Sequence, residues 1–154
     1  MNSKIKIRAA VEGDLAILVE FEQGIIRVER PFNDSLKQEK ICYYDIGALI
    51  EADTSIVMVA EHADKIVGSG YARIKQSKAH LNHQYHTYLG FMYVAPEHRG
   101  EGINKLIMQA LIAWGKEQGM IDFYLDAYAE NSSAIRAYEK MGFSQSLVEM
   151  KLRI

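Results

Sequence analysis

The sequence predicts an α/β (α+β) fold in which a single mixed, mostly antiparallel sheet is flanked by helices. Short segments in which apolar and polar residues alternate are typical of strands with one buried face. Other segments place apolar residues every three or four positions, as helices that cover a sheet do. Of the 154 residues, 49% are apolar and 25% are charged, so we expect one globular domain over residues 1–154 and not a disordered chain.

The first third of the chain predicts one strand followed by two helices. Residues 4–8 alternate basic residues with isoleucine, which favours a half-buried strand. A helix with one apolar face is expected over residues 13–23, and Pro31 breaks the chain after it. Ser35 and the glutamine three residues later form a capping-box pattern, which predicts a second helix over residues 36–52.

The middle of the chain is rich in strand patterns. Residues 55–61 and 66–75 are expected to pair as a hairpin around a turn at residues 62–65. A polar loop follows, and a third strand pattern covers residues 86–94. Because tight hairpins join antiparallel strands, this block predicts the antiparallel part of the sheet.

The last third alternates between helix and strand. Its clearest helix opens at Gly102, and the apolar residues at helical spacing are Ile103, Leu106, Ile107, Ala110, Leu111 and Trp114. A strand is expected over residues 121–128, and Asn131 or Ser132 is expected to cap a short helix. A last strand is predicted over residues 145–153.

Composition limits the partners and the compartment. The formal net charge is −2, so no positive field favours nucleic acid, and no run approaches the ~20 apolar residues of a membrane span. Cys42 is the single cysteine, which excludes an intrachain disulfide and fits a reducing compartment. Residues 1–8 lack the apolar stretch of a signal peptide. We therefore expect a cytoplasmic protein that binds neither nucleic acid nor membrane.

The segment that indicates chemistry is the junction between the strand at residues 86–94 and the helix at Gly102. Gly100 and Gly102 stand at the point where this helix begins. The first turn of a helix leaves backbone N–H groups without partners and carries partial positive charge. Glycines let such a backbone approach a ligand closely. The junction is therefore a candidate pyrophosphate site, and the alternative is that the two glycines only form a tight turn.

Other phosphate-binding motifs fit the junction poorly. A P-loop needs Gly-Lys-Ser/Thr after four spacer residues, and the chain has no such run. A dinucleotide fingerprint needs a third glycine where Lys105 stands. A nucleotide-binding α/β domain nevertheless stays an alternative, and it would be stabilised by ATP or NAD and not by coenzyme A.

Two segments resemble the GNAT-type N-acetyltransferase superfamily. After the turn at Val94 and Pro96, Arg99-x-x-Gly102 is similar to the acetyl-CoA motif Arg/Gln-x-x-Gly-x-Gly/Ala of that family, with Asn104 in place of its last small residue. The run from Asn131 to Phe143 is similar to the family's N-x-x-A-x-x-x-Y-x-x-x-G-F segment. Both motifs occur in order and at the expected spacing, and the order of the predicted elements agrees with the family along nearly the whole chain.

This resemblance implies a GNAT-like (acyl-CoA N-acyltransferase) fold whose fourth and fifth strands are parallel and splay apart around acetyl-CoA. In that arrangement the main chain of Met92, Tyr93 and Val94 pairs with the pantetheine arm. The pyrophosphate lies against Arg99, Gly100, Glu101, Gly102, Ile103 and Asn104. Asn131, Ser133 and Tyr138 line the far side of the arm, and exposed Lys105 or Arg136 meets the 3′-phosphate.

The resemblance also implies an activity. It predicts an acetyl-CoA-dependent N-acetyltransferase in which a primary amine attacks the thioester directly in a ternary complex. Tyr138 corresponds to the family's general acid, although Ala134, Tyr138 and Met141 share a helix face, as core residues do. A backbone N–H from residues 92–94 would polarise the thioester carbonyl. The alternative is a module that binds or senses acetyl-CoA without turnover.

Several residues are candidates for the general base. Strict alternation places every second residue from His86 to Val94 on one face, so His86 and Tyr88 could both point towards the acceptor. The imidazole of His86 has a pKa suited to a base near neutral pH. Glu22 in the first helix, or a chain of water molecules, would serve equally well.

A metal site is not expected. His80, His83 and His86 recur every third residue, but His83 and His86 should face opposite ways in an extended chain. No cysteine lies near them that could complete a set of ligands.

The acceptor is predicted only by class. Residues 12–53 carry ten acidic and four basic side chains, so an acidic wall around a cationic amine is one reading and an ordinary solvated face is the other. Small-molecule amines and peptide or protein amines both fit. If a homodimer forms, we expect it to use a sheet edge or the last strand.

Overall fold

The computed structural model describes residues 4–154, so Met1, Asn2 and Ser3 of the leading segment lie outside it. The strands are β1 (Lys6–Ala9), β2 (Ser55–His62), β3 (Lys65–Gln76), β4 (Tyr85–Val94) and β5 (Phe123–Tyr124). The α-helices are α1 (Leu15–Glu29), α2 (Ile46–Glu51), α3 (Ile103–Glu117) and α4 (Ser132–Lys140). Three short 3-10 helices are η1 (Glu12–Asp14), η2 (Arg30–Phe32) and η3 (Pro96–His98).

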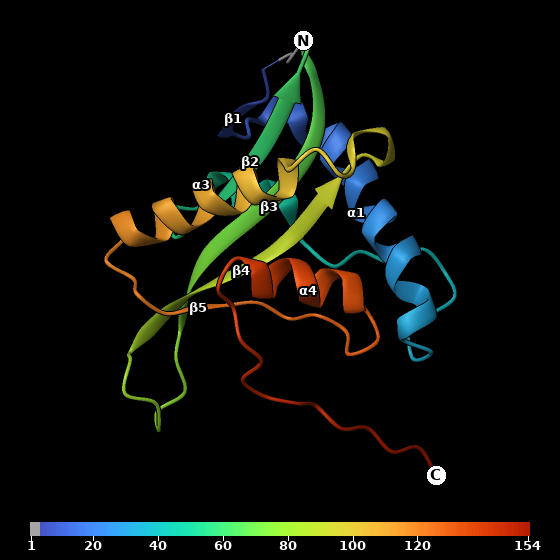
Figure 1. Ribbon diagram of the computed structural model, residues 1–154, viewed down its shortest axis with the longest axis vertical. Coiled ribbons are helices and arrows are strands. Elements are labelled where there is room, and N and C mark those ends of the chain that lie inside the picture. Colours follow the sequence, from blue (N-terminus) through green and yellow to red (C-terminus); the bar gives the residue numbers. More distant parts are fainter. Residues whose placement is uncertain (1–3) are drawn as a thin grey trace.

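Within residues 4–154 the strands form one five-stranded mixed sheet in the order β1-β2-β3-β4-β5 (Figure 1). The first three strand pairs are antiparallel, and β4 and β5 are parallel. The parallel pairing joins Thr87 to Phe123 and Tyr88 to Tyr124, and the two strands separate beyond these residues. The predicted fold class, with parallel strands that part, is confirmed.

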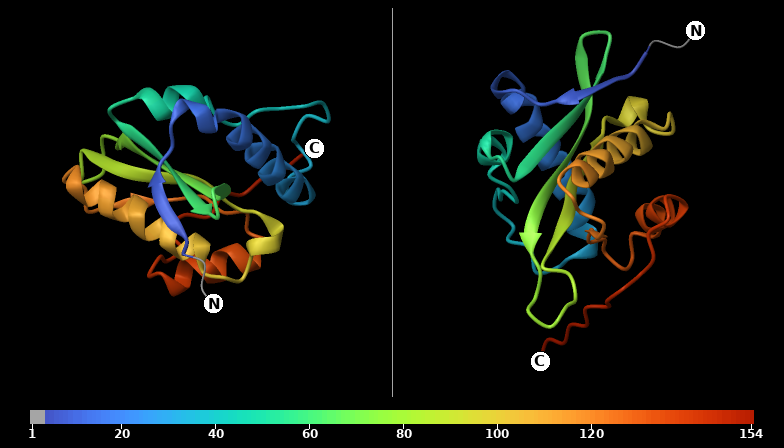
Figure 2. Two further views of the ribbon diagram at one scale, coloured as in Figure 1. Left: turned by 90° about the horizontal axis from the view of Figure 1, so that it is seen from above. Right: turned by 90° about the vertical axis from the view of Figure 1, so that its left-hand side faces the viewer.

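Two helical layers cover the sheet, with α1 and α2 on one face and α3 and α4 on the other (Figure 2). One core joins α1 and α2 to buried sheet residues such as Val57, Val59 and Phe91. The second core joins α3 to buried residues such as Ala60, Ala72 and Leu89, and Tyr138 of α4 packs against it. Among residues 4–154, none of the helices combines the length and apolar character that a membrane crossing requires.

A β-bulge in β4 changes which side chains face which layer. Ser69 pairs with Tyr93 and Tyr71 pairs with Gly90, so the single β3 residue between them opposes both Phe91 and Met92. Phe91 has a φ of 57°, in the left-handed region. The buried hydroxyl of Ser69 donates to the carbonyl oxygen of Phe91 at 3.0 Å, which stabilises this conformation.

The bulge makes the prediction of strict alternation from His86 to Val94 wrong. Tyr88 packs on the α1 side, whereas Met92 and Val94 pack on the α3 side. The extra residue inverts the inward and outward order beyond Gly90.

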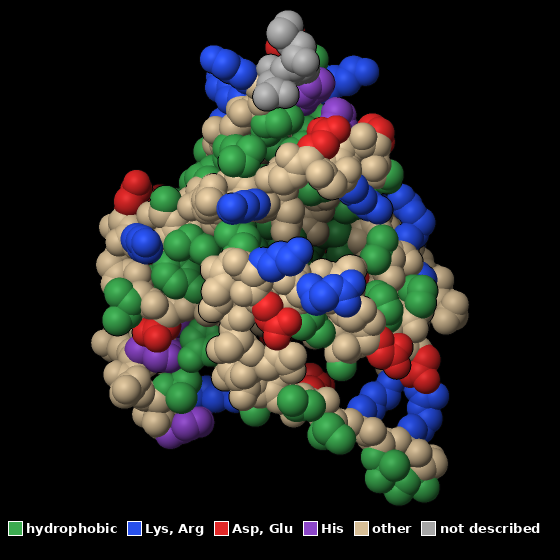
Figure 3. Space-filling model, in the orientation of Figure 1, with side chains coloured by type: hydrophobic (Ala, Val, Ile, Leu, Met, Phe, Trp, Pro, Cys, Tyr) green, Lys and Arg blue, Asp and Glu red, His purple; other side chains and the backbone are tan. Residues whose placement is uncertain are grey.

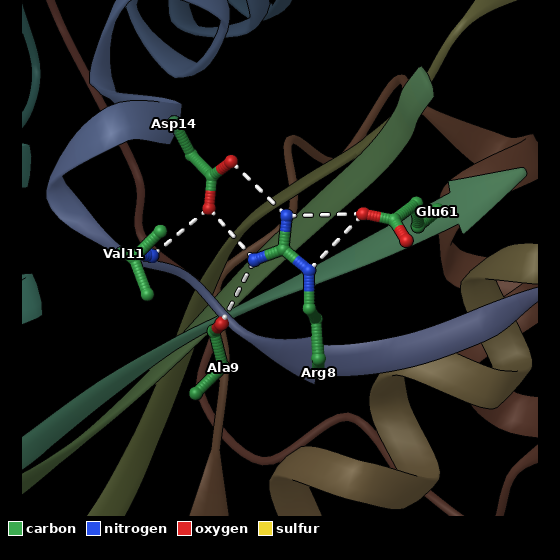
Figure 4. A network of polar contacts seen from close by, with 5 residues as sticks. All are labelled: Arg8, Ala9, Val11, Asp14 and Glu61. Carbon is green, nitrogen blue, oxygen red and sulfur yellow. Dashed lines mark hydrogen bonds and ion pairs between the residues drawn. The ribbon is translucent and has the colours of Figure 1, made fainter. Parts of the chain in front are cut away.

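A network of charged groups fixes the start of the chain to the sheet (Figure 4). The guanidinium of Arg8 donates to both carboxylate oxygens of Asp14, at 2.8 and 3.1 Å, and to Glu61 at 3.2 Å. The backbone N–H of Val11 also donates to Asp14, at 2.9 Å. The Arg8 hydrogen bonds hold the pKa of Asp14 below its ordinary value of 3.8.

The helix predicted over residues 36–52 is wrong for most of its length. Only Ile46–Glu51 is helical, and the side chain of Asp45, not that of Ser35, caps it by accepting from the N–H of Ala48 at 3.2 Å. The preceding residues follow a non-helical path of turns and bends, in which Arg30 donates to the carbonyl oxygens of Lys37 and Glu39. Tertiary hydrogen bonds thus override the capping pattern.

The strand predicted over residues 145–153 is also wrong. This segment forms no strand, all residues from 144 to 154 are exposed, and the tail runs away from the sheet (Figure 1). The predicted strand at residues 121–128 is reduced to Phe123–Tyr124. In contrast, α1 is longer than predicted, because it continues past Gly24 to Glu29.

Candidate functional site

The turn that precedes α3 has the geometry of an anion cradle. Gly100 and Gly102 have φ angles of 84° and 81°, a conformation that side chains other than glycine rarely adopt. A Cβ atom at either position would meet no other atom within 4 Å, so the space beside them is open. The N–H of Leu106 makes a 3.2 Å hydrogen bond to Gly102, so the N–H groups of the preceding helical residues have no partner within the helix.

Arg99 attaches this turn to the end of β4. Its Nε donates to the carbonyl oxygen of Val94 at 2.9 Å, and its guanidinium carbon lies 5.6 Å from the centre of the Tyr93 ring. Glu101 contacts the ring of His98 at 3.2 Å. These contacts hold the turn in a fixed position next to the strand and leave Arg99 exposed to solvent.

An open strand edge leads from this turn towards the point where β4 and β5 part. The residues of β4 beyond Tyr88 have no strand partner on the β5 side among the described residues. Met92, Tyr93 and Val94 therefore present main-chain groups along one wall of the gap. Figure 3 shows Lys and Arg side chains on the molecular face that carries α3 and α4, and Lys105 and Arg136 of these helices are exposed.

The helix α4 and its cap follow the parting strands in the chain. The prediction that Asn131 caps this helix is confirmed, because its side chain accepts from the N–H of Ala134 at 3.4 Å. The hydroxyl of Ser133 donates to the same side chain of Asn131 at 3.3 Å. Asn131 and Ser133, the residues expected on the far side of the pantetheine arm, thus lie together at the start of α4.

Tyr138 lies on the inner side of α4. Its ring is half-buried, packs against the α3-side core and lies 6.2 Å from the ring of Phe143. Burial raises the pKa of Tyr138 to about 12, so its hydroxyl stays protonated at neutral pH. The packing expected of a core aromatic and the protonation expected of an acid therefore coexist at this position.

A cleft of about 690 Å³ opens on the other face of the sheet, beside α2. Four tyrosines line it, namely Tyr43, Tyr44, Tyr71 and Tyr88. The hydroxyl of Tyr88 donates to Asp126 at 2.8 Å, and Asp126, which follows β5, also lines the cleft. Burial and the neighbouring carboxylate raise the pKa of Tyr88, so its hydroxyl acts as a donor here.

The other two base candidates do not line this cleft. Glu22 is 1% exposed, and one carboxylate oxygen accepts from the N–H groups of Tyr43 and Tyr44 at 2.8 and 2.7 Å. This carboxylate therefore positions the loop before α2. His86 contacts the hydroxyl of Ser77 at 2.8 Å, and burial is the main cause that lowers its pKa below 6.5.

The three histidines do not form a metal site. His83 and His86 both contact the hydroxyl of Ser77, so the expectation that they face opposite ways is wrong, because His83 lies in the hairpin loop before β4 begins at Tyr85. Within residues 4–154, no group of three or more His, Cys, Asp or Glu side chains could hold a metal ion.

Three charged residues of the cleft belong to none of the motifs that the sequence shows. Asp126 directly follows the short parallel strand β5, and Arg73 and Lys75 alternate with Tyr71 along β3. Their signal was present, because residues at alternate positions of a strand share a face. The structure describes all ten acidic residues within 12–53, and of these only Asp45 lines the cleft. The cleft wall is therefore less acidic than the charge of residues 12–53 indicates.

Comparison with known proteins agrees with this arrangement. The sequence profile of the acetyltransferase (GNAT) family matches residues 21–143. A relative in Bacillus subtilis (strain 168), described as the uncharacterized N-acetyltransferase YobR, is 38% identical over 56 residues. This match covers 36% of the chain and 23% of the length of that relative.

Solved structures share the fold over nearly the whole chain. The tetramutant of the BH1408 protein from Bacillus halodurans has a TM-score of 0.85 at 22% identity, over 97% of this chain and 99% of that one. A predicted acetyltransferase from Clostridium acetobutylicum, crystallised with acetyl-CoA, has a TM-score of 0.76 at 18% identity, over 97% and 96% of the two chains. Since the family profile spans most of the sequence, the chain belongs to the acetyltransferase (GNAT) family.

Proposed function

We propose that this protein transfers the acetyl group of acetyl-CoA to a primary amine. One observation carries the proposal, namely that the open edge of β4 runs from the glycine turn before α3 to a point beside the tyrosine-lined cleft. That point is where β4 and β5 part, next to the contact between Tyr88 and Asp126. A donor and an acceptor bound on the two sides of the sheet would meet there, so the amine attacks directly in a ternary complex.

Acetyl-CoA binding is supported by the cradle and by the open strand edge. The pyrophosphate would accept hydrogen bonds from the N–H groups of residues 99–104, where the glycines leave open space. The pantetheine arm would pair with the main chain of residues 92–94 and would pass Asn131 and Ser133. Lys105 or Arg136, both exposed, would contact the 3′-phosphate. The family relationship and the acetyl-CoA in the Clostridium structure support the same cofactor.

The proposed chemistry uses one acid and one base. The amine nitrogen forms a bond to the thioester carbon, a main-chain N–H of β4 stabilises the oxyanion, and the carbon–sulfur bond breaks. Tyr138 gives its proton to the leaving thiolate. Asp126 takes the proton that the amine loses, since Asp126 lines the cleft and His86 and Glu22 do not.

Four expectations stay predictions. They are a single domain, a cytoplasmic location, a homodimer, and an acceptor that is either a small molecule or a peptide. A module that binds acetyl-CoA without turnover is the competing function, and an assay of thiol release separates it from an enzyme.

The proposal is tested by following free coenzyme A thiol with acetyl-CoA and a panel of primary amines, for the native protein and for Tyr138→Phe. We expect amine-dependent thiol release that falls about 100-fold in kcat in the variant, because general-acid catalysis contributes at least that much. The Kd of acetyl-CoA should change less than about twofold. Because burial raises the pKa of Tyr138 to about 12, its hydroxyl stays protonated, so the loss of kcat should be the same from about pH 6 to pH 10.

Tyr85→Phe is the matched control, because Tyr85 is exposed at the start of β4, away from the cradle. Unchanged turnover in Tyr138→Phe would remove Tyr138 as the acid. Acetyl-CoA binding without thiol release for any amine would favour the binding module instead.

A further inference from the structure

On the face of the sheet where the cleft opens, side chains of β3 and β4 form a regular array. Arg73 pairs with Tyr88, and Lys75 pairs with His86, so these four residues share the face that also carries Tyr71. On the far side of β4, Tyr88 reaches Asp126 through its hydroxyl. Arg73 and Lys75 on β3 and the carboxylate of Asp126 after β5 therefore lie on either side of Tyr88.

Four charged side chains line the cleft, and the acids differ from the bases in their contacts. Asp45 accepts from the N–H of Ala48 at 3.2 Å, and Asp126 accepts from Tyr88 at 2.8 Å. In contrast, neither the side chain of Arg73 nor that of Lys75 forms a hydrogen bond or an ion pair with another residue of the described chain. The cleft thus presents two cations that lack an anionic partner.

Arg73 is the more informative of the two cations. Its Nε is buried and has no hydrogen-bond partner among the described residues. Buried donors in native proteins are nearly always satisfied, so this N–H is left for an ordered water or a bound molecule to satisfy. Lys75 places its Nζ 4.7 Å from the centre of the Tyr88 ring, which brings a second positive charge to the same row.

We propose that the acceptor is an amino carboxylate, whose amine points to Asp126 and whose carboxylate is bound by Arg73 with Lys75 beside it. This inference rests on the acetyl transfer proposed above. A guanidinium is a planar fork that matches a carboxylate in geometry and charge. Asp126 attracts the amine end, and the tyrosine rings pack against the carbon skeleton between the two charges.

The test uses three amino carboxylates, each paired with its neutral amide: glycine, 4-aminobutanoate and 6-aminohexanoate. Thiol release from acetyl-CoA is measured for each acceptor. For the best pair, we expect a kcat/KM at least tenfold higher for the carboxylate than for the amide. In Arg73→Met this preference should fall at least tenfold through KM, whereas kcat/KM for the amide stays within twofold. Arg73→Lys should restore part of the preference.

Lys65→Met is the control, because it removes an exposed cation from the same strand outside the cleft, and it should keep the full preference. Equal use of amides and carboxylates by the native protein would overturn the inference and leave acetyl transfer intact. An equal loss for both acceptors in Arg73→Met would overturn it too. If no amine releases thiol, the proposed function fails, and the inference fails with it. The comparison of carboxylate with amide in the native protein needs no variant, so it tests the inference even if Arg73→Met does not fold.

Discussion

At the scale of single residues, contacts separate the groups that can act on a substrate from those that support the fold. Glu22 is buried and accepts two backbone hydrogen bonds, so its carboxylate is used to hold the loop before α2. Tyr88 donates to Asp126, which fixes the direction of that carboxylate. Among the candidates for the general base, Asp126 is therefore the one whose carboxylate lines the cleft. It also lies next to the point where β4 and β5 separate.

The pH dependence of the rate distinguishes Asp126 from His86. Burial and the nearby positive charges of His83 and Lys75 lower the pKa of His86 below 6.5. If His86 were the base, activity would be complete above that lowered pKa and would fall as the pH decreases through it. We expect His86→Ala to keep the acidic limb in place and Asp126→Asn to lower kcat/KM about 100-fold, measured as pH–rate profiles. An acidic limb that disappears in His86→Ala would return the role to His86.

At the scale of elements, the network around Arg8 joins β1, η1 and β2. Since the pKa of Asp14 is lowered in the folded protein, its carboxylate stabilises the fold above the ordinary value of 3.8. That contribution is lost as the pH falls through the lowered pKa. We expect Asp14→Asn to reduce the free energy of unfolding by about 1–3 kcal/mol at neutral pH, measured by urea denaturation. Glu12→Gln, at an exposed neighbouring position, should change it little. A loss in Asp14→Asn that is equally large below the lowered pKa would contradict this account.

The close contact between β3 and α3 depends on small residues in the strand. A Cβ on Gly70 would lie 2.7 Å from the sulfur of Met92 and 2.8 Å from Ile107. We therefore expect Gly70→Ala to lower the free energy of unfolding by about 1–3 kcal/mol through overpacking. Gly13→Ala is the control, because a Cβ there meets no atom within 4 Å. Equal denaturation midpoints for both variants would show that this contact is looser than the distances indicate.

Elements with strong local signals were predictable from the sequence, whereas those that depend on distant contacts were not. The glycine start of α3 and the Asn131 cap are local, and each matches the structure. The predicted stripe of α3 is buried at Ile103, Ile107 and Leu111, whereas Leu106 is 40% exposed and was wrongly predicted to be buried. Gly90 directly before the bulge is a local mark, but the left-handed residue is Phe91 itself, and the buried Ser69 hydroxyl on another strand stabilises it. The predicted helix before Ile46 had a capping pattern, but contacts from α1 and from Arg30 hold that segment in a non-helical path.

At the scale of the whole molecule, β4 serves both proposed substrates. Acetyl-CoA would lie along the open edge of β4 and against the turn before α3, and the acceptor would enter from the α2 side. The C-terminal tail takes no part in this arrangement. Its alternating apolar residues predict a strand, but all of them are exposed, because alternation describes a face and supplies no neighbouring strand to pair with.

The most direct test of the central claim is a two-dimensional amide NMR titration of the native protein with acetyl-CoA. We expect the largest shifts at the backbone N–H groups of residues 99–104 and smaller shifts along residues 89–94 of β4, because the pyrophosphate accepts from the first turn of α3. Acetyl-pantetheine, which lacks the pyrophosphate, should shift the β4 amides and leave those of residues 99–104 in place. Saturable binding of acetyl-CoA that does not move the amides of residues 99–104 would contradict the account.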